Sequence, residues 1–129
     1  MITLLFDPRW RRNWRLLLLC LLAAVSWFAF MPSTPHDGLA QLDKLRHLLA
    51  FASLALVAAL GWPPVLANTA RIAGGLMVYG LFIELMQTQL PTRTGSAADW
   101  LADAIGIGMG LLLHRTLRRL GVKICGRPL

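Results

Sequence analysis

The chain has 129 residues, of which 57% are hydrophobic and 15% are charged. A soluble domain averages about 25% charged residues, so a water-soluble monomer of this composition would expose far too much apolar surface. The formal net charge of +7 comes from basic residues that flank the apolar runs. This placement is typical of membrane proteins and argues against nucleic acid as a partner.

Four apolar runs predict four membrane-spanning helices, at about residues 16–31, 44–62, 72–90 and 100–117. The first run follows a basic segment, as in a signal peptide, but Trp27 and Phe28 crowd the candidate cleavage residue Ala29. We therefore expect an uncleaved anchor. Pro63-Pro64 ends the second run. The chain is predicted to be a single all-α domain, residues 1–129, that forms an integral membrane four-helix bundle.

The distribution of Lys and Arg predicts the orientation of this bundle, because cytoplasmic loops carry an excess of these residues. Three of the 13 basic residues belong to the side opposite the N-terminus, namely Lys44, Arg46 and Arg93. The other ten belong to the side of the N-terminus: Arg9, Arg11, Arg12, Arg15, Arg71, Arg115, Arg118, Arg119, Lys123 and Arg127. We therefore expect both termini to be cytoplasmic, with the loops at 32–43 and 91–99 facing outward.

The acidic residues show the opposite bias, since all except Asp7 fall in the predicted outer loops or outer halves of the spans. With a rise of about 1.5 Å per residue, His47, Glu84 and Asp103 lie at similar depths on three different helices. If their faces point inward, they meet in one outward-facing polar pocket. The candidate pocket residues are Asp43, Lys44, His47, Glu84, Gln87, Arg93, Asp99 and Asp103.

Burial energetics make Glu84 and Asp103 the most informative of these residues. A carboxylate near the middle of a spanning helix costs about 2.5–3.5 kcal/mol. We therefore predict that both acids lie within hydrogen-bonding or one-water distance of His47 or Arg93.

Some of these polar residues also have structural interpretations. Asp43 and Asp99 could cap the N-termini of their helices, Gln87 could join two helices, and Arg46 could reach the headgroups. The small residues Ala102, Gly106 and Gly110 recur at every fourth position and predict close approach of another helix. Packing inside the bundle is favoured over a dimer interface.

Three segments resemble the motifs of the VanZ-like family. Residues 43–51, DKLRHLLAF, resemble its D-K-x-x-H-x-x-A-aromatic motif, and residues 80–87, GLFIELMQ, contain its G-x-x-x-E-x-x-Q pattern. Residues 91–93, PTR, followed by 99–106, DWLADAIG, resemble its P-x-R…D-x-x-A-N-x-x-G segment. The resemblance covers about residues 43–110. This chain departs from it at Asp103, where many members have Asn, and the added carboxylate favours a metal or a proton at this position.

The resemblance implies a multi-pass protein of the bacterial cytoplasmic (inner) membrane with a role in the cell envelope. Its founding member is associated with resistance to teicoplanin-type glycopeptides. The expected partners are membrane lipids, including a lipid-linked envelope precursor. The family does not supply a biochemical activity.

Three functions stay open on the sequence. The favoured one is a non-enzymatic envelope protein whose pocket binds a lipid or lipid-linked headgroup, with Lys44, Arg46 and Arg93 meeting phosphate. The second is an intramembrane enzyme in which His47 and Glu84 do acid–base work, or in which a divalent metal is bound by side chains of Asp43, His47, Glu84, Asp99 and Asp103. The third is a scaffold whose polar groups lock the helices together. No cofactor motif is present, and the sequence fixes neither a metal nor an oligomeric state.

Overall fold

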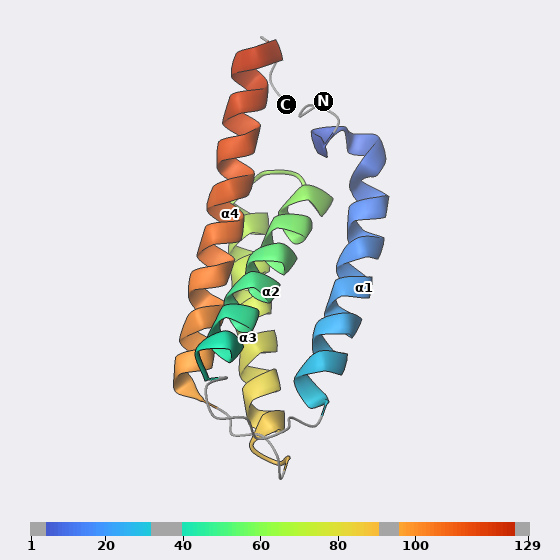
Figure 1. Cartoon of the computed structure of the whole chain (residues 1–129). Coiled ribbons are helices and arrows are strands. Elements are labelled where there is room, and N and C mark those ends of the chain that lie inside the picture. The colour runs from blue at the N-terminus through green and yellow to red at the C-terminus, as the bar shows by residue number, and fades with distance from the viewer. Residues whose placement is uncertain (1–4, 32–39, 91–95, 126–129) are drawn as a thin grey trace.

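The computed structural model describes the backbone of residues 5–31, 40–90 and 96–125, and the side chains of 5–31, 42–90 and 96–123. These ranges contain helices and no strand. In chain order they are the short 3-10 helix η2 (Pro8–Trp10), α1 (Arg11–Phe30), α2 (Ala40–Gly61), α3 (Leu66–Gln87) and α4 (Ala97–Cys125) (Figure 1). The predicted all-helical architecture with four long helices is confirmed.

The largest differences from the predicted spans are at three helix ends. Helix α1 begins at Arg11, five residues before the predicted span, because the basic residues that precede the apolar run are also helical. Helix α3 begins at Leu66 rather than at residue 72, so Arg71 lies in its second turn and not in a loop. Helix α4 extends to Cys125, well past residue 117. Charge marks where an apolar run ends, but Arg and Lys are good helix formers and do not end a helix.

The four helices run alternately up and down (Figure 1). The start of α1, the connection between α2 and α3, and the end of α4 share one end of the bundle. The end of α1, the start of α2, the end of α3 and the start of α4 share the other, which we call the polar end because it carries the polar residues described below. Helix α2 packs most extensively against α4 and also contacts α1 and α3.

Two glycines allow the close packing of α4 on α2. A Cβ atom at Gly106 would collide with the carbonyl oxygen of Leu48, and one at Gly110 would collide with that of Ala52. Ala102, the third small residue of this row, is buried. The row therefore packs inside the bundle, as favoured from the sequence, and it fixes which face of α4 points toward α2.

The bundle is apolar outside and holds carboxylates inside. Large apolar side chains such as Trp27, Leu66 and Val78 are 72%, 86% and 68% exposed, whereas Asp103 is fully buried. Three segments are long and apolar enough to cross a membrane: Pro8–Phe30, which includes η2 and α1, Leu42–Gly61 and Leu66–Gln87. An apolar exterior around a polar interior is the arrangement that a bilayer favours.

Helix α4 is not among these three segments, although it is the longest helix. Its hydropathy is lowered by Asp99, Asp103 and its glycines, and the two acids lie on the buried side. Its exposed side carries an apolar stripe formed by Leu101, Ile105, Met109 and Leu112. Mean hydropathy averages the two faces of a helix, so it understates how apolar the outer face of α4 is.

Candidate functional site

The polar end contains a buried cluster formed by His47, Glu84 and Asp103, which we call the His–carboxylate cluster. The three side chains come from α2, α3 and α4 respectively. Nδ1 of His47 lies 2.9 Å from Oδ1 of Asp103, within hydrogen-bonding distance, and 3.8 Å from Oε1 of Glu84. The three side chains are 10%, 8% and 0% exposed. The prediction that both acids approach His47 is confirmed.

One oxygen of each carboxylate lacks a hydrogen-bond partner within the described ranges. Oε2 of Glu84 accepts a hydrogen bond from the backbone N–H of Ser96, at 2.6 Å. Its other oxygen, Oε1, is buried without such a partner and faces His47 at the ion-pair distance given above. Oδ2 of Asp103 is likewise buried without a hydrogen-bond partner. Buried polar atoms are nearly always satisfied, so these two oxygens mark a place where a donor or a cation is expected.

His47 also belongs to a second group, with Asp43 and Asp99. The ligand-capable atoms of these three side chains lie within 4.8 Å of one another, as do those of the His–carboxylate cluster. Asp99 is buried and Asp43 is partly exposed. His47 is therefore close to four carboxylates in all, two in each group.

The remaining predicted pocket residues lie away from this cluster or outside the described ranges. Gln87 is buried and donates a hydrogen bond from Nε2 to the carbonyl oxygen of Ala29, at 3.0 Å, so it joins α3 to α1. Lys44 is exposed. Arg46 is also exposed, and its guanidinium lies 4.0 Å from a carboxylate oxygen of Asp43. Arg93 lies outside the described residues.

The proposed helix-capping roles of Asp43 and Asp99 are wrong, because both residues lie inside the first turns of their helices. There the negative charge of each carboxylate interacts favourably with the positive end of the helix dipole. The residue before α4 is Ser96, whose Oγ accepts a hydrogen bond from the backbone N–H of Ala98, at 3.1 Å. Sequence reasoning missed Ser96, although a Ser three residues before Asp99 resembles a capping box.

Gly80 makes room for the carboxylate of Asp103. A Cβ atom at Gly80 would lie 2.7 Å from Oδ2 of Asp103 and 3.2 Å from the Phe51 ring. Any larger residue at position 80 would push Asp103 away from α3. The glycine of the G-x-x-x-E segment therefore has a direct steric role in the cluster, one full turn before Glu84.

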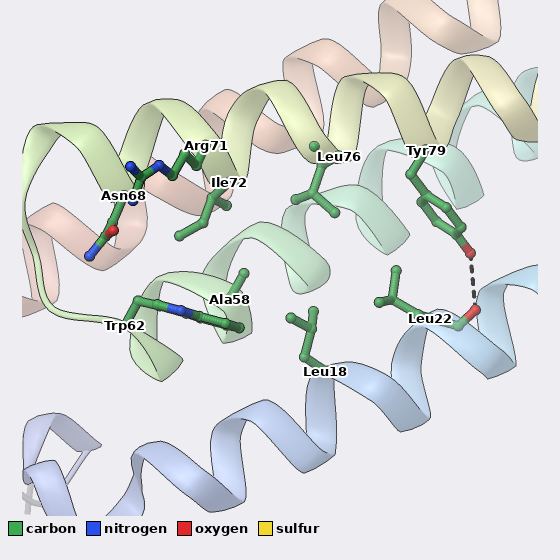
Figure 2. Close-up of a pocket in the computed structure, with 10 residues that line it drawn as sticks. Leu18, Leu22, Ala58, Trp62, Asn68, Arg71, Ile72, Leu76 and Tyr79 are labelled. Atoms are coloured by element: carbon green, nitrogen blue, oxygen red, sulfur yellow. Dashed lines mark hydrogen bonds between the residues drawn. The ribbon is translucent and has the colours of Figure 1, made fainter.

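A cavity of about 460 Å³ lies elsewhere, between α1, α2 and α3. Figure 2 shows Leu18 and Leu22 of α1 facing Leu76 of α3 across it, with Arg71 of α3 toward one end. The Tyr79 hydroxyl donates a hydrogen bond to the carbonyl oxygen of Leu22, at 3.0 Å (Figure 2). The lining is mainly apolar, and none of the eight predicted pocket residues contributes to it.

The chemistry available at the His–carboxylate cluster follows from its donor set. One imidazole and two carboxylates can ligate a divalent cation or move a proton. The carboxylates can also accept hydrogen bonds from the hydroxyl or ammonium groups of a ligand. No family model, curated protein or solved structure matches the chain, so the VanZ-like resemblance stays a prediction from its motifs.

Proposed function

We propose that the chain is a four-span VanZ-like protein of the bacterial cytoplasmic membrane that binds the polar headgroup of a lipid or lipid-linked envelope precursor. Its termini are cytoplasmic, and its polar end faces outward. The observation that carries the proposal is Oε1 of Glu84, which is buried beside His47 at that end of the bundle and has no hydrogen-bond partner within the described ranges.

Membrane insertion is supported by the distribution of polarity in the fold. Three helices have the length and hydropathy of membrane spans, and α4 carries an apolar stripe on its exposed side. The start of α1 and the end of α4 lie at the same end (Figure 1), as an even number of crossings requires. Nine of the 11 basic residues in the described ranges lie toward that end, which makes it the cytoplasmic end by the positive-inside rule.

Headgroup binding is supported by the chemistry of the polar end. A hydroxyl or ammonium group of a headgroup would donate to Oε1 of Glu84, which has no hydrogen-bond partner within the described ranges. The exposed Lys44 and Arg46 stand on the first turns of α2, where a phosphate at the membrane surface would meet them. The acyl chains of the same lipid would lie against the apolar exterior.

The test is lipid retention by the full-length protein, purified in a mild detergent and analysed by native mass spectrometry. We expect the wild type to retain a polar lipid in stoichiometric amount. Glu84→Gln keeps the shape of the side chain but removes its charge, and should lower the retained fraction about tenfold, as expected for loss of a buried charged hydrogen bond. Asp7→Asn is the matched control, because it makes the same chemical change at the opposite end.

Equal lipid retention in wild type, Glu84→Gln and Asp7→Asn would contradict headgroup binding at this site. The polar groups would then act as a scaffold, a role that Gln87 already has through its bond to Ala29. Equal loss of lipid in Glu84→Gln and Asp7→Asn would show that lipid retention does not depend on the position of the lost charge. That result would also contradict the proposal.

A second candidate function is an intramembrane enzyme. It is favoured by the hydrogen bond between His47 and Asp103, with Glu84 close by, because a carboxylate-bound imidazole beside a second carboxylate suits acid–base catalysis. This function predicts that the bound lipid is chemically converted over time, which the same mass spectra would show. Conversion in wild type that stops in His47→Asn, with lipid still bound, would favour the enzyme.

A further inference from the structure

We propose that the His–carboxylate cluster binds a divalent transition-metal ion of the Zn²⁺ or Mn²⁺ type, with Nδ1 of His47 and one oxygen each of Glu84 and Asp103 as ligands. Two buried carboxylates and one imidazole form a mixed oxygen and nitrogen donor set, which suits these ions. The inference rests on the proposed site but not on lipid binding to it.

The distances between the three ligand atoms fit such an ion. Zn²⁺ binds imidazole nitrogen and carboxylate oxygen at about 2.0–2.2 Å, so two ligands of a tetrahedral site are about 3.4 Å apart. In the structure, Nδ1 of His47 lies 2.9 Å from Oδ1 of Asp103 and 3.8 Å from Oε1 of Glu84, and one ligand-capable atom of each side chain lies within 4.8 Å of those of the other two. Small side-chain adjustments would bring all three onto one ion.

The unpartnered Oε1 of Glu84 is the second, independent observation. Glu84 is 6% exposed, its Oε2 is already bound by the Ser96 N–H, and its Oε1 points to His47 without a hydrogen-bond partner. The Ser96 bond orients the carboxylate so that Oε1 faces the cluster, as the outer partners of metal ligands commonly do.

The charge balance at the polar end also favours a cation. Glu84 and Asp103 are both buried, and within the described ranges their ion pairs are both with His47. Buried carboxylates are stabilised when they are paired or when they coordinate a metal. An ion with charge +2 would compensate two of them.

An ion held by three protein ligands keeps at least one open coordination position. That position would bind water or an oxygen of a phosphate, which would give the site a direct contact to a phosphorylated headgroup. Asp103 supplies the third protein ligand of the proposed ion.

The experiment is Zn²⁺ and Mn²⁺ titration of the chelator-treated, full-length protein in detergent, followed by isothermal titration calorimetry. We expect stoichiometric binding by the wild type. Glu84→Gln and Asp103→Asn should each weaken binding at least tenfold, since even partners outside the ligand set change metal affinity by about 10–100-fold. The matched control Asp7→Asn should bind as the wild type does.

A spectroscopic measurement on the wild type alone keeps the test independent of variant folding. Co²⁺ in place of the ion should give the visible d–d absorption of a four-coordinate nitrogen and oxygen site. Absence of binding by the wild type, a Co²⁺ spectrum identical to that of the free aqua ion, or unchanged affinity in both ligand variants would each overturn the proposal.

The two proposals fail in different ways. If the metal-free protein retains lipid and no metal binds, the metal inference is wrong while headgroup binding stands. If Zn²⁺ binds as expected but no lipid is retained with or without it, headgroup binding is wrong and the metal site stands.

Discussion

Nδ1 of His47 and Oδ1 of Asp103 lie 2.9 Å apart, and this contact joins α2 to α4 at a point where the Asp103 side chain is fully buried. The two residues are 56 positions apart in the chain. Because they are paired, the effect of replacing either residue on stability depends on the other. Removal of one partner leaves a buried group without its counterpart, which destabilises a protein more than the intact pair stabilises it.

The first prediction therefore concerns the stability of this pair. His47→Leu should lower the free energy of unfolding by about 3–5 kcal/mol, because Asp103 loses its buried partner. The double variant His47→Leu/Asp103→Leu should recover part of that loss. Thermal and denaturant unfolding in one detergent would measure both effects. Strictly additive effects of His47→Leu and Asp103→Leu would show that the two side chains are not coupled.

The second prediction concerns the packing of α4 on α2. Gly106→Ala should lower the free energy of unfolding by about 1–3 kcal/mol, because the new Cβ atom would meet the backbone of Leu48. Gly108→Ala is the matched control, since nothing lies within 4 Å of its Cβ position on the same helix. The melting temperatures of the two variants in detergent give the comparison. Similar melting temperatures would mean that α4 does not pack on α2 through this face.

The third prediction concerns the Tyr79 hydroxyl, which bonds to the carbonyl oxygen of Leu22 and lies 2.8 Å from Oγ of Ser26. Tyr79→Phe keeps the ring and removes both contacts between α3 and α1. Hydrogen bonds between membrane helices contribute about 0.6 kcal/mol on average and about 1.7 kcal/mol at most. We expect a destabilisation in this range, measured by unfolding in detergent. Phe82→Leu, at a half-exposed position of α3, should have less effect.

The fourth prediction concerns topology, tested by cysteine labelling in intact cells after both native cysteines are replaced by Ala. Gln89→Cys, just after α3 at the polar end, should react with a membrane-impermeant maleimide added from outside. Thr69→Cys, exposed in the first turn of α3 at the other end, should react only after permeabilisation. The reverse pattern would place the polar end in the cytoplasm and refute the proposed orientation.

The sequence by itself determined the number of helices and the level of the acids along them. Run length and charge placement are local properties, so four apolar runs gave four helices in the predicted order. The rise per residue placed His47, Glu84 and Asp103 at one level, and the approach of both acids to His47 is confirmed. Helix ends were predicted less well, because a helix continues through basic residues, as α4 does up to Cys125.

The tertiary structure decided which of these polar residues meet. A sequence gives the face that a residue shares with its neighbours, but the rotation of each helix about its axis depends on the helices packed against it. Gly106 allows α4 to pack closely on α2, in an orientation in which Asp103 faces His47. Gly80 leaves space for the carboxylate of Asp103. Gln87, one turn after Glu84, is instead directed to Ala29 of α1. The buried unpartnered oxygens arise only from this assembly, because burial and pairing are properties of the packed bundle and not of any one helix.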